Sequence, residues 1–496
     1  MLEGLQLATG PSSLFVIAVG VLLGIMVGAL PGFTATMGTA LLLPFTFSME
    51  PGQGLAMLGA LYVAAMYADA VPACLVNTPG TPSAMATAFD GFPLTQQGHA
   101  QKALVASSFS SMVGATLGGL TFLFLSGVLA SVALQFGPPE FFWIGIFALT
   151  IIGSIAGDSM LKGLAGGALG MLIGTIGISA TGAVSRYTFD LPDLRGGLNE
   201  VAALIGVFAM PQVLRMVANR REKHTVASYT RSPGVSLETV REILRRPVNL
   251  FRSAIIGTLV GLLPGAGSPV ASLVSYNEAV RWSKDKTKFG KGSLDGVVAS
   301  EAANNGAAGG AMVPLAGLGI PGSAPAAVIL GALLLHGLQP GPQLFQTRPE
   351  LVYGFAWAIV IAGIGTFLFG SVLAGLLARM VTIPVRLLAP IVLFLSVVGS
   401  FAIRNNIIDV FLMVGLGVGV YLLGKLGFHP GPIGLGVILG PIVEPALVQS
   451  MAMTEASSAF EVFFTRPVSL IVIVLTLISV AWVIWSKQRE RQHVVD

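Results

Sequence analysis

The chain has 496 residues, of which 54% are hydrophobic and only 10% are charged, whereas a soluble globular domain carries about 25% charged residues. Its mean hydropathy of +0.83 therefore excludes a soluble domain and indicates an integral membrane protein. The net charge of +4 does not indicate nucleic-acid binding, because much of the positive charge lies in loops, as the positive-inside rule describes for an inner membrane.

Apolar runs recur along the whole chain, among them residues 14–30, 201–217 and 468–485. Because about 20 apolar residues cross the hydrocarbon core as a helix, the length allows roughly 11 or 12 transmembrane segments. No basic residue precedes the first run, so we expect no cleaved signal peptide. The single cysteine, Cys74, allows no intrachain disulfide.

A polar stretch over residues 219–252 divides the chain in two. Its first basic residues are Arg220, Arg221, Lys223 and Arg231. Such a stretch predicts a cytoplasmic position, and the basic tail at 487–491 predicts a cytoplasmic C-terminus. We predict a first transmembrane repeat over 12–218, a basic cytoplasmic linker over 219–252, a second transmembrane repeat over 253–447, and a final transmembrane helix with its cytoplasmic tail over 448–496.

The two halves of the chain repeat each other. Pro31-Gly32 returns as Pro264-Gly265, 233 positions later. Pro79-Gly80 returns as Pro321-Gly322, 242 positions later, and the change of offset indicates an insertion near residues 284–291. Self-similarity of this kind predicts two structural repeats of about 200 residues each.

Loop charge predicts that the repeats are inverted. The loop over 48–54 is acidic or neutral, but its equivalent over 281–291 is strongly basic. Opposite charge at equivalent positions places the two loops on opposite sides of the membrane. Residues 253–280 form two arms of about a dozen residues, too short to cross a core of about 30 Å twice. We therefore expect re-entrant hairpins, one tipped at Pro264-Gly265 and entering from the cytoplasm, the other tipped at Pro31-Gly32 and entering from outside.

Two helix breaks fall inside apolar regions. Pro79 and Pro82 lack the N–H that a helix interior needs, and Gly80 between them is flexible. The run 318–325 repeats this pattern. A break at membrane depth is tolerated only where protein or a polar cavity covers it. Transporters use paired breaks of this kind to bind a solute near the bilayer midplane, so we expect the two breaks to share one site.

Polar side chains accompany the second break. Glu301, Asn304 and Asn305 share roughly one side of a predicted helix. Such groups are costly at membrane depth and usually face the interior of a helix bundle. Glu301 is open to two interpretations, a paired structural carboxylate or an ion-coupling group. Asp90, in the pair Asp90-Gly91, is expected to cap a helix or form a turn.

The candidate site gathers these motifs. The predicted substrate-binding residues are Pro31, Gly32, Asn77, Thr78, Pro79, Gly80, Thr81, Gly265, Ser268, Asn304, Asn305, Pro321, Gly322 and Ser323. The predicted ion-coupling residues are Asp69 and Glu301. The alternatives are a purely structural kink at the breaks, structural hairpin tips, and asparagines that only cross-link helices.

We assign no catalytic residue and no metal ligand. The five histidines show no His-x-x-x-His spacing, and the chain has no Gly-x-x-x-x-Gly-Lys-Ser/Thr phosphate loop. A transition-metal site, ATP hydrolysis and an organic cofactor are therefore not expected. The only small ion implied is Na⁺ or H⁺ as a coupling ion.

Together the motifs resemble the large membrane subunit of the tripartite tricarboxylate transporters, the TctA family. The residues that carry this resemblance are 30–32, 75–80, 90–93 with Gly98, 162–163, 263–265, 289–292, 301–305, 318–323 and 337–342. The resemblance implies a permease of a bacterial inner membrane that imports a tricarboxylate or related organic acid. It also implies a small membrane subunit of the TctB type, a periplasmic solute-binding protein of the TctC type, and an ion gradient rather than ATP.

One stretch departs from the family. Where the family often has Tyr-Gly-Gly-Ser before the first break, this chain has Tyr-Ala-Asp-Ala-Val-Pro over 67–72, which introduces Asp69. A carboxylate there repels an anionic substrate unless it is protonated or paired with a cation. Asp69 therefore indicates a different solute, a proton-coupled step or a sodium ligand, with a solvated cavity wall as the structural alternative.

The most consistent prediction is a secondary transporter of a small carboxylate that works by alternating access, and not an enzyme. An ion or solute channel is the first alternative. An intramembrane enzyme is the second, but Asp69, Asp90 and Glu301 are scattered without a known intramembrane catalytic signature.

Overall fold

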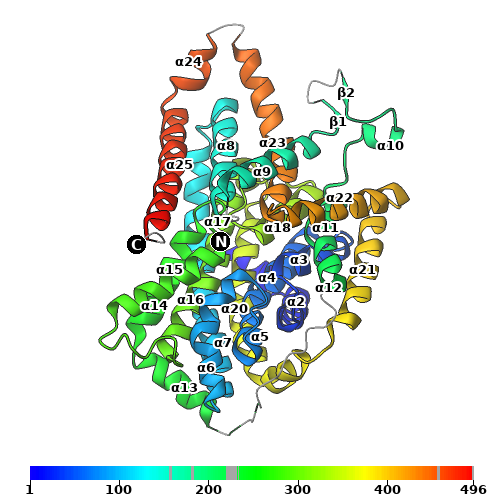
Figure 1. The fold of residues 1–496 in the computed structure, drawn as a ribbon. Helices are drawn as coiled ribbons and strands as arrows, with labels where there is room; N and C mark the ends of the chain where they lie inside the picture. The colour runs from blue at the N-terminus through cyan, green and yellow to red at the C-terminus, as the bar shows by residue number, and fades with distance from the viewer. Residues whose placement is uncertain are drawn as a thin grey trace. The chain divides into compact units, whose positions relative to one another are not determined.

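The computed structural model describes residues 1–155, 159–179, 184–218, 229, 232, 234–454 and 458–493. Within them, β1 (Gly177–Ile178) pairs antiparallel with β2 (Ser185–Arg186), and the other regular elements are helices. The chain divides into two compact units, labelled by element in Figure 1. Unit 1 comprises Met1–Ala130 and Gln212–Ile403, and unit 2 comprises Ser131–Pro211 and Arg404–Asp496. Each unit thus draws on both sequence repeats.

Unit 1 carries the first part of each repeat. Its helices are α1 (Leu2–Thr9), α2 (Pro11–Ala29), α3 (Ala35–Thr46), α4 (Pro51–Ala68), α5 (Ala70–Val76), the 3₁₀ turn η1 (Pro82–Ala84), α6 (Met85–Gln96), α7 (Ala100–Ala133), α12 (Met210–Ala218), α13 (Val235–Leu244), α14 (Pro247–Gly261), α15 (Gly267–Trp282), α16 (Leu294–Gly310), α17 (Met312–Leu318), α18 (Ala324–Leu335), α19 (Pro342–Thr347), α20 (Pro349–Met380) and α21 (Val385–Ala402). Helices α7 and α12 run slightly past the borders of the unit.

Unit 2 carries the second part of each repeat. Its helices are α8 (Pro138–Ile155), α9 (Met160–Gly174), α10 (Pro192–Arg195), α11 (Glu200–Phe208), α22 (Ile407–Lys425), α23 (Pro430–Met453), α24 (Ala459–Phe464) and α25 (Pro467–His493). Helix α23 packs against α8 and α9, and α25 packs along α8 (Figure 1). The buried Glu140 at the start of α8 pairs with Arg466 at 2.8 Å and accepts from Ser469 at 2.9 Å, which ties α8 to α25.

The predicted all-α polytopic membrane fold is confirmed. Seven helical spans in the described residues are long and apolar enough to cross a membrane: Pro11–Ala29, Pro51–Val76, Ala100–Ala133, Glu200–Ala218, Pro349–Met380, Ile407–Lys425 and Pro430–Met453. Five shorter apolar helices accompany them: Ala35–Thr46, Met160–Gly174, Ala324–Leu335, Leu387–Ala402 and Pro467–Ile478. The count of 11 or 12 crossings stays a prediction.

The predicted domain limits, which follow the sequence repeats, stay a prediction. In the linker over 219–252, Arg220, Arg221, Lys223 and Arg231 lie outside the described residues, whereas α13 forms in its second half. The insertion near 284–291 falls in the loop between α15 and α16.

The repeats use the same helix packing, residue by residue. In α2, a Cβ at Gly24 would overlap the carbonyl oxygen of Leu61 in α4. In the second repeat, a Cβ at the equivalent Gly257 of α14 would overlap the carbonyl oxygen of Ala303 in α16. Glycine at these positions lets the two backbones touch, as small residues do between helices in membranes.

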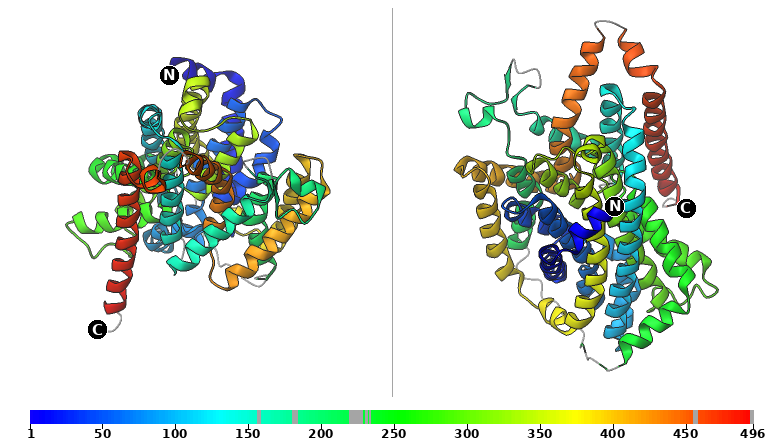
Figure 2. Two further views of the ribbon diagram at one scale, coloured as in Figure 1. Left: turned by 90° about the horizontal axis from the view of Figure 1, so that it is seen from above. Right: turned by 180° about the vertical axis from the view of Figure 1, so that it is seen from behind.

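The contacts between α4 and α16 favour the inverted arrangement. Asn304 of α16 donates from Nδ2 to the carbonyl oxygen of Met66 in α4 at 2.8 Å. Glu301, one turn before Asn304, lies close enough to Asp69 for the charges to act on each other. Moving forward along α4 thus matches moving backward along α16, so these equivalent helices run antiparallel. Helices α14 and α15, of 15 and 16 residues, pack side by side as the predicted hairpin and can be followed in Figure 2.

We predict that Gly257→Ala destabilises the protein by about 1–3 kcal/mol, because the added methyl group forces α14 away from α16. Gly419→Ala is the matched control, since Gly419 of α22 has no atom within 4 Å of an added Cβ and alanine favours the helix by up to about 1 kcal/mol. Thermal unfolding of the detergent-purified variants measures both. Equal midpoints for the two variants would contradict the packing argument.

The inverted topology predicts that Ser48 and Lys284, both exposed, lie on opposite sides of the membrane. In a Cys74→Ala background, an impermeant maleimide should label Ser48→Cys in intact cells and Lys284→Cys only after the cells are opened. Labelling of both variants in detergent controls for reactivity. Labelling of both cysteines from the same side would show that the repeats are parallel.

Candidate functional site

Both predicted breaks are present in unit 1, at equivalent positions. Helices α5 and α17 end in left-handed residues, Asn77 with φ +53° and Gly319 with φ +72°. The junctions before them also match, since Asp69 has φ −66° and ψ −19° and Ala311 has φ −65° and ψ −18°. The repeat is therefore preserved in backbone conformation as well as in sequence.

The tip of each hairpin lies against the break of its own repeat. Gly265, with φ +81°, donates its N–H to the carbonyl oxygen of Gly322 at 3.0 Å. At the first break, a Cβ on Gly80 would lie 3.5 Å from the carbonyl oxygen of Phe33. Gly32, with φ +82°, forms that tip, and its carbonyl accepts from Gln212. The predicted tips and breaks thus come together in pairs.

A polar cluster surrounds the second break. The hydroxyls of Tyr62 in α4 and Ser323 lie 3.1 Å apart, and Ser323 Oγ caps α18 by accepting from Ala326 N–H at 3.3 Å. Ser268 at the start of α15 donates to the carbonyl oxygen of Asn304 at 3.1 Å. Four of the predicted residues, Ser268, Asn304, Gly322 and Ser323, are therefore held close together.

Asp69 joins the first break. Its Oδ2 lies within hydrogen-bond distance of the hydroxyls of Thr81 and Ser83, the latter at 3.1 Å, and the two hydroxyls lie 2.6 Å apart. A Cβ on Gly80 would lie 3.3 Å from the Cβ of Asp69, so a glycine here lets the break approach the carboxyl group. Asp69 is only 1% exposed; no described side chain donates to its Oδ1, and the backbone N–H of Ala70 interacts with its carboxyl group.

Glu301 is fully buried, and both of its oxygens are bonded. Oε1 accepts from Thr87 of α6, and Oε2 accepts from Ser111 of α7 at 3.0 Å. Within the described part of the chain, neither Glu301 nor Asp69 forms an ion pair. Glu301 therefore ties α16 to two other helices, whereas Oδ1 of Asp69 has no donor among the described side chains.

The other predicted residues differ in exposure. Asn77 is exposed, Thr78–Thr81 are half-buried, and Pro321 and Gly322 are buried. Asn305 is fully buried, and neither atom of its amide has a partner among the described residues. Because buried polar groups are nearly always bonded, this amide is a candidate ligand group. The left-handed backbone conformation of Asn77 is a second explanation for an asparagine at this position, because Asn and Gly adopt that conformation more readily than other residues.

Sequence reasoning did not include several residues of the site. Ser83 and Thr87 follow the first break at helical spacing, a local signal that could have identified them. Tyr62 and Ser111 carry no such signal, because their partners Ser323 and Glu301 lie 261 and 190 residues away along the chain.

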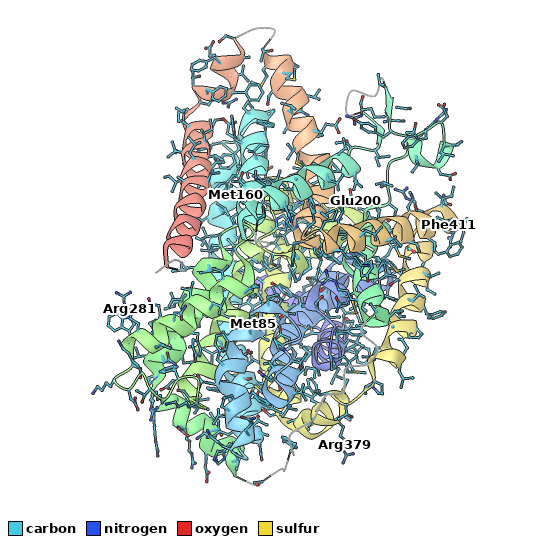
Figure 3. All side chains as sticks on the ribbon, in the orientation of Figure 1. Met85, Met160, Glu200, Arg281, Arg379 and Phe411 are labelled. Atoms are coloured by element: carbon cyan, nitrogen blue, oxygen red, sulfur yellow. The ribbon has the colours of Figure 1, made fainter. Side chains whose placement is uncertain are left out.

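Of the two roles expected for Asp90, a turn at Asp90-Gly91 is wrong because Asp90 lies inside α6, whereas a role as a helix cap is found at the start of α16. Its Oδ1 accepts from the N–H groups of Gly292 at 3.0 Å and Ser293 at 2.7 Å, and its Oδ2 accepts from Tyr276 at 2.9 Å. Asp90 thus caps the start of α16 from a distant part of the chain and helps to place the helix that carries Glu301. Figure 3 shows Met85, at the start of α6, and Arg281, near the end of α15.

Within the described residues, no group of three or more His, Cys, Asp or Glu side chains could hold a metal ion. The polar groups of the site are hydroxyls, amides and two carboxyls. Such groups can bind an anionic solute together with a monovalent cation or a proton.

The chain is similar to two proteins of Agrobacterium vitis. An uncharacterized 52.8 kDa protein in the TAR-I ttuC' 3' region of Agrobacterium vitis is 34% identical over 480 residues, which is 96% of this chain and 95% of the relative. An uncharacterized protein in the TAR-II ttuC' 3' region of the same organism is 34% identical over 239 residues, 48% of this chain and 98% of the relative. No solved structure matches the chain.

A family model described as the tripartite tricarboxylate transporter TctA family matches residues 14–435. This match covers both helix breaks and the polar residues of α16. The resemblance inferred from the motifs is confirmed, and the chain belongs to the tripartite tricarboxylate transporter TctA family, as a membrane component of transport.

Proposed function

We propose that this chain is the large permease subunit of a binding-protein-dependent secondary transporter that imports a tricarboxylate or related organic acid. The observation that carries the proposal is that unit 1 contains two helix breaks, each with a hairpin tip against it, and two buried carboxyls, one between α4 and α5 and one on α16. Import is coupled to Na⁺ or H⁺ by alternating access, in which the part that holds the breaks moves against a scaffold.

The breaks supply what a carboxylate needs. Thr81 is the N-cap of η1 and Ser323 is the N-cap of α18, so a hydroxyl group stands at each of two helix starts. Helix N-termini favour anions through the helix dipole. The substrate's negative charge would be balanced by these groups and by a nearby cation or proton. This avoids a permanently buried Lys or Arg, which is costly in a membrane.

The partners proposed are a small membrane subunit of the TctB type and a periplasmic solute-binding protein of the TctC type. The word tripartite in the family description supports them. The location proposed is the bacterial inner membrane with the C-terminus in the cytoplasm, which the basic loop over 281–291 and the basic tail support. A catalytic role is not proposed, because the family is one of transporters.

Reconstitution separates coupled transport from a channel. Liposomes that contain this chain and the small membrane subunit, supplied with the binding protein, should accumulate labelled citrate or succinate only when a Na⁺ or H⁺ gradient is imposed. Omission of the binding protein should abolish accumulation. Uptake that persists after both gradients are collapsed and without the binding protein would indicate a channel instead.

A pair of variants tests whether the Asn77 side chain contacts substrate. Asn77→Gly keeps the left-handed conformation, as the equivalent Gly319 does, so the helix break should persist while the amide is lost. We expect uptake to fall about 5- to 150-fold in Asn77→Gly and in Asn77→Ala, because each removes a polar group whose loss would cost roughly 1–3 kcal/mol of binding free energy. Normal uptake by the glycine variant would assign Asn77 a backbone role only.

A further inference from the structure

Three oxygen atoms form a closed triangle at the first break. Asp69 Oδ2 contacts the hydroxyls of Thr81 and Ser83, and these hydroxyls lie 2.6 Å from each other. Every pair in the triangle is therefore within hydrogen-bond distance. A hydrogen bond needs one proton between its two oxygens, and each hydroxyl has one proton to donate.

Counting protons decides the state of the carboxyl group. If Asp69 is ionised, Thr81 and Ser83 supply two protons for three contacts, and one pair of oxygens faces each other without a proton. If Asp69 is protonated, three protons serve three contacts and the ring closes, with each group donating once. We infer that Asp69, Thr81 and Ser83 form a proton-binding site in which Asp69 holds the proton that is co-transported; this last role rests on the proposed transport function.

The surroundings favour the neutral carboxyl. Asp69 is 1% exposed, and no described residue forms an ion pair with it. The titratable groups whose charges interact with it are Glu301 of α16 and the Cys74 thiol of α5, with the Tyr67 phenol of α4 beside Glu301. None of these is a cation. Burying an unpaired carboxylate costs far more than burying a hydrogen-bonded neutral acid.

The second repeat shows that the fold does not need this carboxyl. Ala311 occupies the position of Asp69 with the same backbone conformation and offers only a methyl group. Ser323, the equivalent of Thr81, caps its helix by accepting from Ala326 N–H, whereas the side chain of Thr81 makes no cap and bonds Asp69 instead. In the first repeat, the hydroxyl at this position therefore belongs to the triangle and not to a helix cap.

Glu301 does not need the extra proton. Thr87 and Ser111 each donate to a different oxygen of Glu301, and Ser300, which lies 2.8 Å from Thr87 and 3.1 Å from the carbonyl oxygen of Val297, can donate its one proton to either of them. This is an open chain in which each contact to the carboxyl has its own donor. The geometry therefore assigns the exchangeable proton to Asp69 and a helix-linking role to Glu301.

The triangle couples the proton to an anionic substrate. While Asp69 is neutral, a carboxylate can bind at the adjacent break without repulsion. When the proton leaves for water, one carboxylate forms and one O–H bond breaks. The triangle must then open, because the Thr81 and Ser83 hydroxyls both turn to the carboxylate. Loss of the proton would thus both expel the anion and change the first break.

Infrared spectroscopy of the full-length protein in lipid nanodiscs, in sodium-free buffer, tests the proton directly. At neutral pH the wild type should show a protonated-carboxyl carbonyl band that Asp69→Asn removes. The same band should remain in Glu301→Gln, the matched amide control. Thr81→Val, which removes one hydroxyl without changing volume, should shift the band, and Thr81→Ser should restore it. Thermal unfolding confirms that each variant is folded.

Several results would overturn the inference. These are a band that persists in Asp69→Asn, a band lost only in Glu301→Gln, and a band abolished by Na⁺ at constant pH, which would make this a sodium site. An unshifted band in folded Thr81→Val would also overturn it, even if Asp69→Asn fails to fold. A proton at Asp69 in a protein whose liposomes accumulate no citrate or succinate would keep the site and refute only its role in transport.

Discussion

A helix that breaks inside a membrane leaves backbone groups that lipid cannot satisfy, and this constraint explains why each break has a hairpin tip beside it. In the second repeat, the N–H of Gly265 reaches the carbonyl oxygen of Gly322. In the first, the turn at Gly32 and Phe33 approaches Gly80. Each tip turns at a glycine with positive φ, where other residues are strained. Hairpin and break are therefore one structural device, present once per repeat.

Helices α4 and α16 hold the two pairs of hairpin and break in place. The side chains that link them differ in chemistry between the two repeats. Tyr62 and Asn304 occupy matching positions of the repeat, 242 residues apart. Yet Tyr62 bonds the hydroxyl of Ser323, and Asn304 bonds the backbone of Met66. The backbone thus follows the repeat closely, while the side chains at its centre have diverged. Under the proposed function, divergence of this kind would let a symmetric scaffold present an asymmetric site to a small solute.

The two buried carboxyls show the same division of roles. Glu301 uses both oxygens to hold α6 and α7 against α16, so its removal would loosen three helices at once. Asp69 sits at a helix junction that Ala311 forms equally well, so its carboxyl is free for another purpose. Under the proposed function, a carboxyl group that can be neutral or charged beside the bound substrate would control when an anion can stay bound.

The sequence alone determined the membrane class, the two repeats, both helix breaks and the hairpins that accompany them. These features depend on local chemistry, namely apolar length, proline and glycine, which act within a few residues. It also singled out Asp69 and Glu301 as unusual. Only the tertiary structure decided their different environments, the contact of Tyr62 with Ser323, and the capping of α16 by Asp90. Those depend on residues far apart along the chain that are brought together by packing, and no local pattern records such distances.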